Sequence, residues 1–288
     1  MRWKVAPERA LLLGRPIGAG IVNVTDDSMW EGARSETAAG AVADGLRLAA
    51  GGFEMIDVGA VPARAGDPVL AEAEAAKLIP AIEGLRERLP AAVAISADTF
   101  NPGVARAAVA AGADVINDIG GGTDEMLEVA AEAACGLVLM HIEGTPRVNR
   151  KAPDYPDVVA RLLEWFGGRI ARAVELGVDE AAIAIDPGLD FDLSVDHDIE
   201  ILRRLRELHA LGRPLYVSLS RKDFIGAIAA GSWQHRWSAD QRRNGTLAAV
   251  TLATAAGAQI HRLHDIEALD AIRVAAALSP VWDGASRK

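Results

Sequence analysis

Eight short apolar runs recur along the chain, and each of them ends in polar residues. Continuous apolar runs of this length are typical of strands buried on both faces of a parallel sheet. A polar group where a buried strand ends needs a partner or a chemical role. The runs are "IVNVTDDS" (21–28), "MIDVGA" (55–60), "ISADTF" (95–100), "VINDIGGG" (115–122), "LVLMHIEG" (137–144), "IAIDPGLD" (183–190), "LYVSLSRK" (215–222) and "IHRLHD" (260–265).

Segments with helical periodicity, most of them rich in Ala, Leu, Glu and Arg, separate these runs. They cover residues 36–50, 70–88, 101–112, 124–135, 154–177, 195–211, 239–257 and 265–278. Alternating strands and helices predict a parallel sheet covered by helices. Eight repeats predict an α/β fold, a (β/α)8 TIM barrel, as a single domain over residues 1–288 with its core at about 17–278.

A doubly wound open sheet is the alternative architecture. It normally carries a G-x-G-x-x-G turn after its first strand, whereas the first run here ends in "NVTDDS". In a barrel, the carboxyl ends of the strands meet at one mouth, which is where active sites lie. The polar groups predicted to face that mouth are Asn23, Asp57, Asp98, Asn117, His141, Asp186, Ser220, Lys222, Arg262 and His264.

Composition narrows the possible partners. A formal net charge of −10 and a pI near 5.1 argue against a nucleic-acid partner, which usually needs a basic face. No apolar stretch approaches the roughly 20 residues needed to cross a bilayer, so no membrane partner is expected. The N-terminus is too weakly apolar for a secretion signal, and the single cysteine, Cys135, indicates a reducing, cytoplasmic location.

Three of the mouth residues suggest a ligand. Asp98, Asn117 and Asp186 supply hydrogen-bond acceptors and one amide donor, which suit a flat heterocycle carrying N–H groups. The competing interpretation is that Asp98 and Asp186 cap the helices that follow them. The turn "LSRKDFIG" (219–226) combines two cations with a helix start and is predicted to bind an anion, unless it is only a solvated basic turn.

The last apolar run and the metal ligands add two expectations. Arg262 and His264 lie two positions apart on a strand, so their side chains share one face. His141 and His264 are too few for a zinc site, but Asn23 with substrate phosphate oxygens suits Mg²⁺.

The tryptophans of "WQHRW" (233–237) indicate a packing or subunit face, and we expect a homodimer.

In chain order, these strand ends resemble those of dihydropteroate synthase, the pterin-binding barrel enzyme of folate synthesis. The resemblance spans residues 17–278, and eight phrases occur in the family's order. "GIVNVTDDS", for example, is similar to the family's G-I-L-N-V-T-P-D-S. The other phrases are "ISADT", "INDIGGG", "LMHIEGTP", "IDPGLDF", "LSRKDFIG", "NGTLAA" and "IHRLHD".

The resemblance implies an activity. The family condenses 6-hydroxymethyl-7,8-dihydropterin diphosphate with p-aminobenzoate, an arylamine, and releases pyrophosphate. Asp98, Asn117 and Asp186 would hold the pterin ring, and Lys222 would reach its carbonyl and ring-nitrogen edge. Catalytic roles are implied for Lys222, Asp98 and Arg262.

The resemblance also implies the contacts of the diphosphate and of the second substrate. Asn23 would help to place a Mg²⁺ cofactor and the diphosphate, with Arg262 and His264 at the anion site. Further substrate contacts are implied for Arg64, Met140, Phe191 and Ser220.

Two loops depart from the family pattern. The family's D-x-G-G-E-S-T-R-P-G reads "DVGAVPARAG" (57–66) here, and this loop normally closes over p-aminobenzoate and the diphosphate. In "DPGLDFDLS", Asp190 and Asp192 replace glycines and Leu193 replaces a lysine. Two added carboxylates and one lost cation are expected to make the acceptor side hostile to a benzoate. Asp26 also stands where proline is usual.

Four hypotheses therefore remain open at this stage. The first is dihydropteroate synthase activity, and the second is the same chemistry with another arylamine. The third is a pterin-binding paralogue without catalysis. The fourth is methyl transfer from a methylated folate, which leaves "SRK" (220–222) unexplained and lacks a cobalamin module in this chain.

Overall fold

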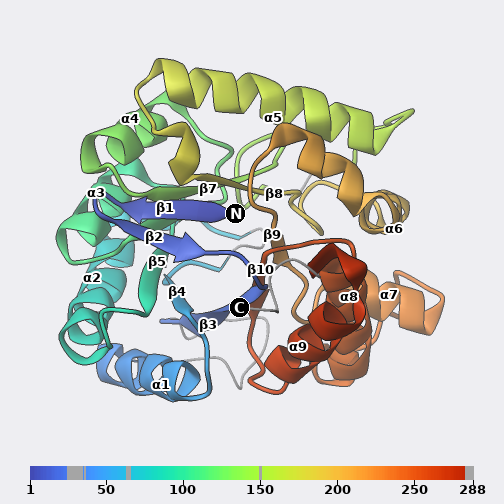
Figure 1. The fold of residues 1–288 in the computed structure, drawn as a ribbon, viewed down its shortest axis with the longest axis horizontal. Helices are drawn as coiled ribbons and strands as arrows, with labels where there is room; N and C mark the ends of the chain where they lie inside the picture. Colours follow the sequence, from blue (N-terminus) through green and yellow to red (C-terminus); the bar gives the residue numbers. More distant parts are fainter. Residues whose placement is uncertain (25–34, 36, 63–65, 149–150, 283–288) are drawn as a thin grey trace.

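A computed structural model describes residues 1–24, 35, 37–62, 66–148 and 151–282. Eight parallel strands form one sheet in the order β8-β7-β6-β5-β4-β3-β10-β9. The two ends of this sheet meet at a bridge between Ile185 and Leu215, where the Ile185 N–H donates to Pro214 O at 3.0 Å. The sheet therefore closes into a barrel, and the alternative of an open sheet is wrong (Figure 1).

All eight predicted strands are present. They are β3 (Ile17–Asn23), β4 (Met55–Gly59), β5 (Ala94–Asp98), β6 (Val115–Asp118), β7 (Gly136–Met140), β8 (Ile183–Asp186), β9 (Tyr216–Ser218) and β10 (Ile260–Leu263).

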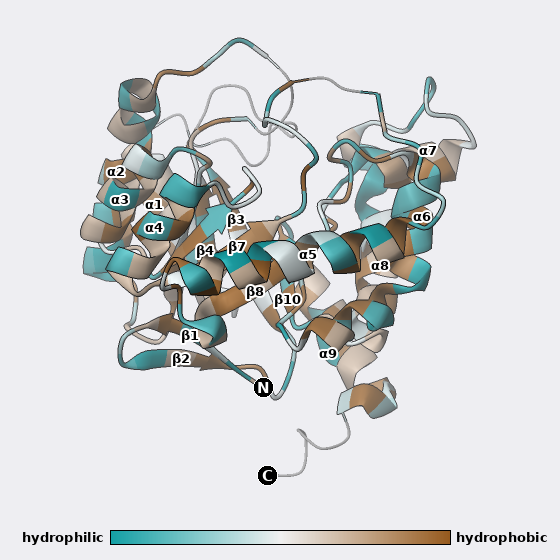
Figure 2. Ribbon diagram, turned by 90° about the horizontal axis from the view of Figure 1, so that it is seen from above, coloured by the Kyte–Doolittle hydropathy of each residue, from teal (hydrophilic) through white to brown (hydrophobic). Residues whose placement is uncertain are grey.

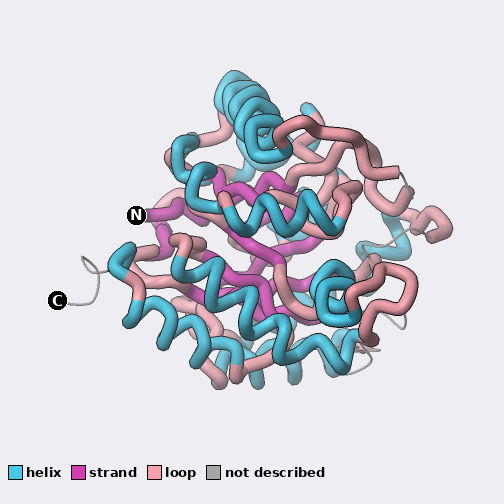
Figure 3. Tube along the Cα trace, turned by 90° about the vertical axis from the view of Figure 1, so that its right-hand side faces the viewer, coloured by secondary structure: helices cyan, strands magenta, loops and turns pink. Residues whose placement is uncertain are grey.

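The helices surround the strands, as Figure 3 shows. The predicted segment 195–211 is divided, because the α-helix ends at Arg203 and a 3₁₀ helix, Leu205–Leu211, follows it. Helix α7 (Asp223–Ala230) was not among the predicted helical segments. The other helices are α1 (Ala38–Ala50), α2 (Ala71–Arg88), α3 (Pro102–Ala110), α4 (Asp124–Ala133), α5 (Val158–Glu175), α6 (Val195–Arg203), α8 (Arg243–Ala255) and α9 (Ala268–Leu278).

A hairpin that the sequence did not reveal covers the N-terminal end of the barrel. Strands β1 (Arg2–Ala6) and β2 (Arg9–Leu12) pair antiparallel, and Figure 2 shows them at one end of the molecule. Trp3 is fully buried and donates its indole N–H to Ala182 O at 2.7 Å. Its ring packs with the lowest inward-facing residues of the strands, including Met55, Ala94 and Ile260. The hairpin thus separates the barrel floor from water.

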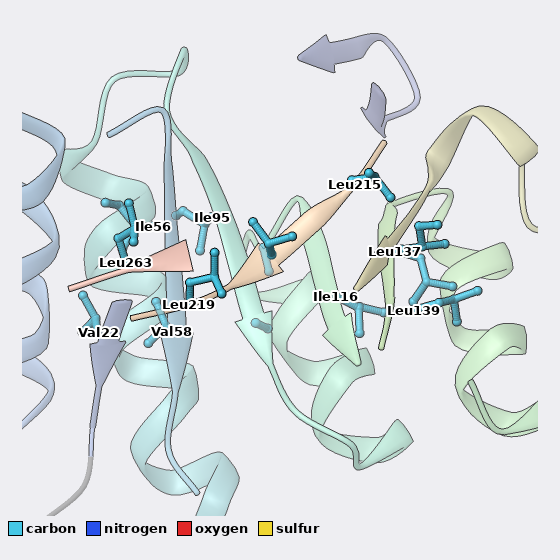
Figure 4. Close-up of a cluster of buried hydrophobic side chains, with 14 of the residues drawn as sticks. Val22, Ile56, Val58, Ile95, Ile116, Leu137, Leu139, Leu215, Leu219 and Leu263 are labelled. Atoms are coloured by element: carbon cyan, nitrogen blue, oxygen red, sulfur yellow. The ribbon is translucent and has the colours of Figure 1, made fainter. Parts of the chain in front are cut away.

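A period of two residues divides each strand between two environments. One set of side chains faces the helices and is mostly apolar, as the cluster in Figure 4 shows, with buried Asp118 and His261 as polar members. The other set faces the barrel interior and is apolar near the floor but polar near the mouth. Its polar members are Asp57, Ser96, Asp98, Asn117, Asp186, Ser218 and Arg262.

The strand register brings these polar side chains together. Asp98 of β5 lies beside Asn117 of β6, and Arg262 of β10 lies beside Ser218 of β9. Met140 of β7 lies beside Asp186 of β8 in the same way.

In the part of the chain that the structure describes, no helix is both long enough and apolar enough to span a bilayer.

Candidate active site

Arg262 forms the centre of the polar layer at the barrel mouth. Its Nε donates to Asp57 Oδ2 at 2.5 Å, and its Nη2 donates to Asp98 Oδ2 at 2.6 Å. Asp57 is completely buried, so removal of the guanidinium would leave an uncompensated charge in the barrel. Burial by itself disfavours the charged guanidinium, but the attraction of Asp57 and Asp98 outweighs it and raises the pKa of Arg262.

Asp57 and Asn117 extend this cluster across the barrel. Asn117 Nδ2 donates to Asp57 Oδ2 at 3.2 Å, so the Asp57 carboxylate accepts from both an amide and a guanidinium. The two residues come from β4 and β6, on either side of β5. The Asn117 amide is therefore fixed in orientation while it lies next to Asp98 in the sheet.

The pKa of Asp98 is raised to about 7. Burial is the main cause, the charge of Arg262 opposes it, and the negative charges of Asp57 and Glu74 add to it. Glu74 is 2% exposed and reaches this region from α2. Glu74 was not among the predicted site residues, because nothing in "AEAEAAK" (71–77) distinguishes it from the surface glutamates of a helix.

Asp186 is held by two donors at the end of β8. Its Oδ1 accepts from the Gly188 N–H at 2.9 Å, and its Oδ2 accepts from Ser218 Oγ at 2.9 Å. Burial raises the pKa of Asp186, and these bonds and the charges of Lys222 and Arg262 oppose that shift. Ser218 was also missed, although it lies two residues before Ser220 and so shares its face of the strand.

The helix-cap interpretation of the two carboxylates is wrong. Asn101 caps α3, where its Oδ1 accepts from the Gly103 N–H at 3.0 Å, and Ser194 caps α6. Asp98 and Asp186 instead bond to side chains or backbone within the barrel mouth.

Lys222 lies on the same mouth and is 7% exposed. Its Nζ donates to Leu189 O at 2.8 Å and lies 4.4 Å from the centre of the Phe191 ring. Both partners belong to the loop between β8 and α6, so this loop determines where the ammonium points. Phe191 also packs on a small apolar cluster that includes Met140, Ile119 and Ile142.

Ser220 and His264 form a second polar pair at the mouth. Ser220 Oγ lies 2.8 Å from His264 Nδ1 and accepts the His264 backbone N–H at 3.3 Å. Burial, together with the charges of Arg262 and Arg221, lowers the pKa of His264 to about 3. At neutral pH the His264 ring is thus uncharged.

Two expectations about the basic turn are wrong. Arg221 points away from the mouth, because its Nη2 donates to Asp265 Oδ1 at 3.0 Å and its Nη1 donates to Ala239 O at 3.1 Å. The start of α7 already holds an internal anion: the Asp223 and Phe224 N–H groups donate to the Asp190 carboxylate at 2.5 and 3.0 Å. Lys222 is therefore the only one of the turn's two cations directed at the mouth cluster within the described residues.

The same contacts correct the interpretation of Asp190. Its carboxylate is directed at the start of α7, where two backbone N–H groups and the positive end of the helix stabilise its negative charge. His141 also differs from the prediction. It follows the inward-facing Met140 by one residue, so it points outward, where its ring packs edge-on against Trp165 with ring centroids 5.0 Å apart.

The predicted metal ligand, Asn23, is the last residue of β3, and its backbone carbonyl accepts from the Ser35 N–H at 2.9 Å. Arg64 and Asp26 lie outside the described residues. Within the described residues, no three His, Cys, Asp or Glu side chains are grouped so that they could hold a metal ion.

The side chains of Asp98, Asn117, Asp186 and Lys222 thus gather at the mouth of a closed (β/α)8 barrel, which is where enzymes of this fold have their active sites. Residues 19–264 match the family described as pterin binding enzyme. Dihydropteroate synthase from Synechocystis sp. is 38% identical over 263 residues, which cover 90% of this chain and 89% of the relative. The chain belongs to the dihydropteroate synthase family of pterin binding enzymes.

Two further comparisons bear on activity. A Mycobacterium tuberculosis protein named inactive dihydropteroate synthase 2 is 38% identical over 270 residues, which cover 92% of this chain and 81% of that protein. The structure of Xanthomonas albilineans dihydropteroate synthase with 4-aminobenzoic acid superposes with a TM-score of 0.85 at 39% identity, covering 96% of this chain and 97% of the other. The sequence is thus similar both to relatives named dihydropteroate synthase and to relatives named inactive dihydropteroate synthase 2.

Proposed function

We propose that the protein is a dihydropteroate synthase: it condenses 6-hydroxymethyl-7,8-dihydropterin diphosphate with p-aminobenzoate and releases pyrophosphate. The observation that carries the proposal is the convergence of Asp98, Asn117, Asp186 and Lys222 on one barrel mouth. Relatives support it, since Xanthomonas albilineans dihydropteroate synthase has been solved with 7,8-dihydropteroate.

The hydrogen-bonding groups of the mouth match those of a pterin. Asp186 and Asp98 offer carboxylate oxygens to the ring N–H and amino groups, and Lys222 offers an ammonium to the ring carbonyl. Asp186 is fixed by the Gly188 N–H and by Ser218, so it needs little reorganisation when the ring binds. Met140 and Phe191 lie beside these groups and provide apolar contact for the face of the ring.

The reaction requires charge stabilisation without a covalent enzyme intermediate. The C–O bond between the pterin methylene and the diphosphate breaks, and its electron pair leaves with pyrophosphate. The arylamine lone pair then forms the C–N bond, and the arylamine nitrogen loses its proton to water. The carboxylates of Asp98 and Asp186 favour the positive charge that grows on the pterin. The departing phosphate oxygens lie, in this proposal, beside the uncharged ring of His264.

The proposed cofactor is Mg²⁺, with Asn23 as its protein ligand. Within the described residues the mouth lacks a cage of acidic ligands, which fits an ion that keeps several waters and binds through substrate phosphates. When bound, Mg²⁺ would neutralise charge on the diphosphate. A test that is independent of turnover is pyrophosphate binding by calorimetry with and without Mg²⁺, in the wild type and in Asn23→Ala.

Turnover provides the direct test. The protein is incubated with the pterin diphosphate, Mg²⁺ and p-aminobenzoate, and both pyrophosphate and dihydropteroate are measured. We expect both products in equal amounts, and Lys222→Ala should abolish them. If no arylamine supports pyrophosphate release, the proposed activity is wrong.

The relatives named inactive favour a second candidate, a pterin-binding paralogue without catalysis. The altered loop "DVGAVPARAG" (57–66) is the sequence feature behind this candidate. It predicts that calorimetry detects bound pterin diphosphate and that the diphosphate stays intact after prolonged incubation with arylamines. A third outcome, turnover with a substituted aniline but not with p-aminobenzoate, would assign a different acceptor.

We also propose a cytoplasmic homodimer. Large apolar side chains are exposed on neighbouring elements at one side of the barrel, including Ile228 of α7, Leu252 of α8 and Leu278 of α9. Trp233 and Trp237 follow α7 and are 46% and 41% exposed. Burial of such residues between subunits is favourable, and sedimentation of the wild type beside Trp237→Glu tests the dimer.

A further inference from the structure

Three consecutive residues of the β8–α6 loop bind the segment that carries Lys222. Leu189 O accepts from Lys222 Nζ at 2.8 Å, and the Phe191 ring lies 4.4 Å from the same nitrogen. Between them, the Asp190 carboxylate accepts from the Asp223 and Phe224 N–H groups at 2.5 and 3.0 Å. The side chain of Lys222 and the helix that begins directly after it are thus both held by this one short loop.

The conformation and environment of Asp190 show why it can do this. Its φ of 67° lies in the left-handed region, which turns its carboxylate toward α7. Its own N–H donates to Asp198 Oδ1 of α6 at 3.2 Å, which links the loop to a second helix. Asp198 is 1% exposed, and burial together with the negative charge of Asp190 raises its pKa well above the ordinary value. Burial also raises the pKa of Asp190, while the charge of Lys222 and the N–H groups of Phe224 and Asp223 oppose that shift.

We propose that Asp190 is a positioning residue for Lys222: it fixes the N-terminus of α7 against the β8–α6 loop, so that the ammonium of Lys222 is directed into the mouth. This inference rests on the proposed pterin site, because Lys222 is the group through which Asp190 acts. It also gives a role to a carboxylate that stands where the family pattern has glycine. Glycine at this position fits the backbone but cannot supply the two acceptor oxygens.

A double-mutant cycle tests the coupling between the two residues. Binding of 6-hydroxymethylpterin is measured by calorimetry for the wild type, Asp190→Gly, Lys222→Ala and the double variant. Loss of charge-assisted hydrogen bonds at α7 should weaken binding about tenfold when Lys222 is present. In the Lys222→Ala background, the Asp190→Gly change should alter affinity by less than about twofold. An equal effect in both backgrounds would show that Asp190 supports only the general fold, and the proposal would be wrong.

Two companion variants separate positioning from stability. Asp192→Gly removes a neighbouring carboxylate of the same loop that also has a positive φ, 53°, and it should leave pterin affinity unchanged. Asp190→Asn keeps one acceptor oxygen and tolerates the left-handed conformation, so it should restore affinity to within about threefold of the wild type. Failure of Asp190→Asn to bind better than Asp190→Gly would contradict the role assigned to the carboxylate oxygens.

A second measurement does not require any pterin to bind. Amine acetylation with acetic anhydride is followed by mass spectrometry of the peptides that contain Lys222 and Lys77. Lys222 is 7% exposed and held by Leu189 O, so it should react slowly in the wild type and several times faster in Asp190→Gly. Exposed Lys77 serves as the internal standard. If the wild type binds no pterin, the proposed function fails, but unchanged Lys222 labelling is the result that overturns the positioning role itself.

Discussion

Arg262 and Asp98 are 164 positions apart in the sequence, yet the guanidinium Nη2 lies 2.6 Å from the Asp98 carboxylate. Closure of the barrel brings the last strand, β10, next to β3 and across the interior from β5. One arginine thereby serves two buried carboxylates, since its Nε also contacts Asp57 at 2.5 Å. The positions of Asp57 and Asp98 in the mouth depend on this shared guanidinium.

Removal of the guanidinium should therefore destabilise the protein strongly. Arg262→Met leaves Asp57 and Asp98 buried together without a cation, and breaking such a pair costs about 3–5 kcal/mol. We expect the free energy of unfolding, measured with urea, to fall by about 3 kcal/mol. Arg47→Met, on an exposed residue of α1, is the control and should change it by less than about 0.5 kcal/mol. An unfolding curve of Arg262→Met that matches the wild type would contradict the observed pairing.

Pterin affinity should depend on pH through Asp98. Its pKa of about 7 means that the carboxyl is protonated below that pH, where its O–H becomes a donor and only its carbonyl oxygen remains a good acceptor for the N–H groups of a pterin. Affinity for 6-hydroxymethylpterin should rise as the pH increases through about 7, and the dependence should disappear in Asp98→Asn. The same raised pKa makes the contribution of Asp98 to stability greatest below its ordinary pKa and lost as the pH rises through about 7. Calorimetry from pH 6 to 8 tests the binding, and an affinity that is flat over this range would contradict the assignment.

Glu74 should determine where that pH transition falls. Its negative charge is one of the causes that raise the pKa of Asp98, and its own pKa is raised by burial. Glu74→Gln removes the charge but keeps the shape, so the pKa of Asp98 should fall and the affinity transition should move to lower pH. Glu72→Gln changes an exposed residue on the same helix and should leave the transition in place. A shift in the opposite direction would show that Glu74 stabilises the ionised form of Asp98.

The N-terminal hairpin should contribute substantially to stability. Trp3 is fully buried and its indole bonds to Ala182 O, so Trp3→Ala should lower the free energy of unfolding by about 3–5 kcal/mol. Leu12→Ala, in β2 of the same hairpin, alters a side chain that is 69% exposed and should cost less than about 1 kcal/mol. Urea denaturation compares the two, and similar midpoints for both variants would mean that the hairpin does not close the barrel floor in solution.

The repeated pattern of the sequence predicted the architecture. Runs such as "MIDVGA" (55–60) alternate with helical segments, and eight such units favour a closed barrel over an open sheet, which the Ile185–Leu215 bridge confirms. The strand-end residues Asp98, Asn117 and Asp186 were found for the same reason, because the chain direction alone places them at the mouth. The β1–β2 hairpin was missed, since its two strands are short and only partly apolar.

By itself, the sequence determined the order of strands and helices and the set of polar groups delivered to one end of the barrel, because both follow from periodicity along the chain. Only the tertiary structure decided the partners: Arg262 between Asp57 and Asp98, Asp190 on the N-terminus of α7, and the His141 ring against Trp165. Those contacts join residues of different strands and loops, and their geometry depends on how the sheet closes and where each side chain can be buried, which no local pattern specifies.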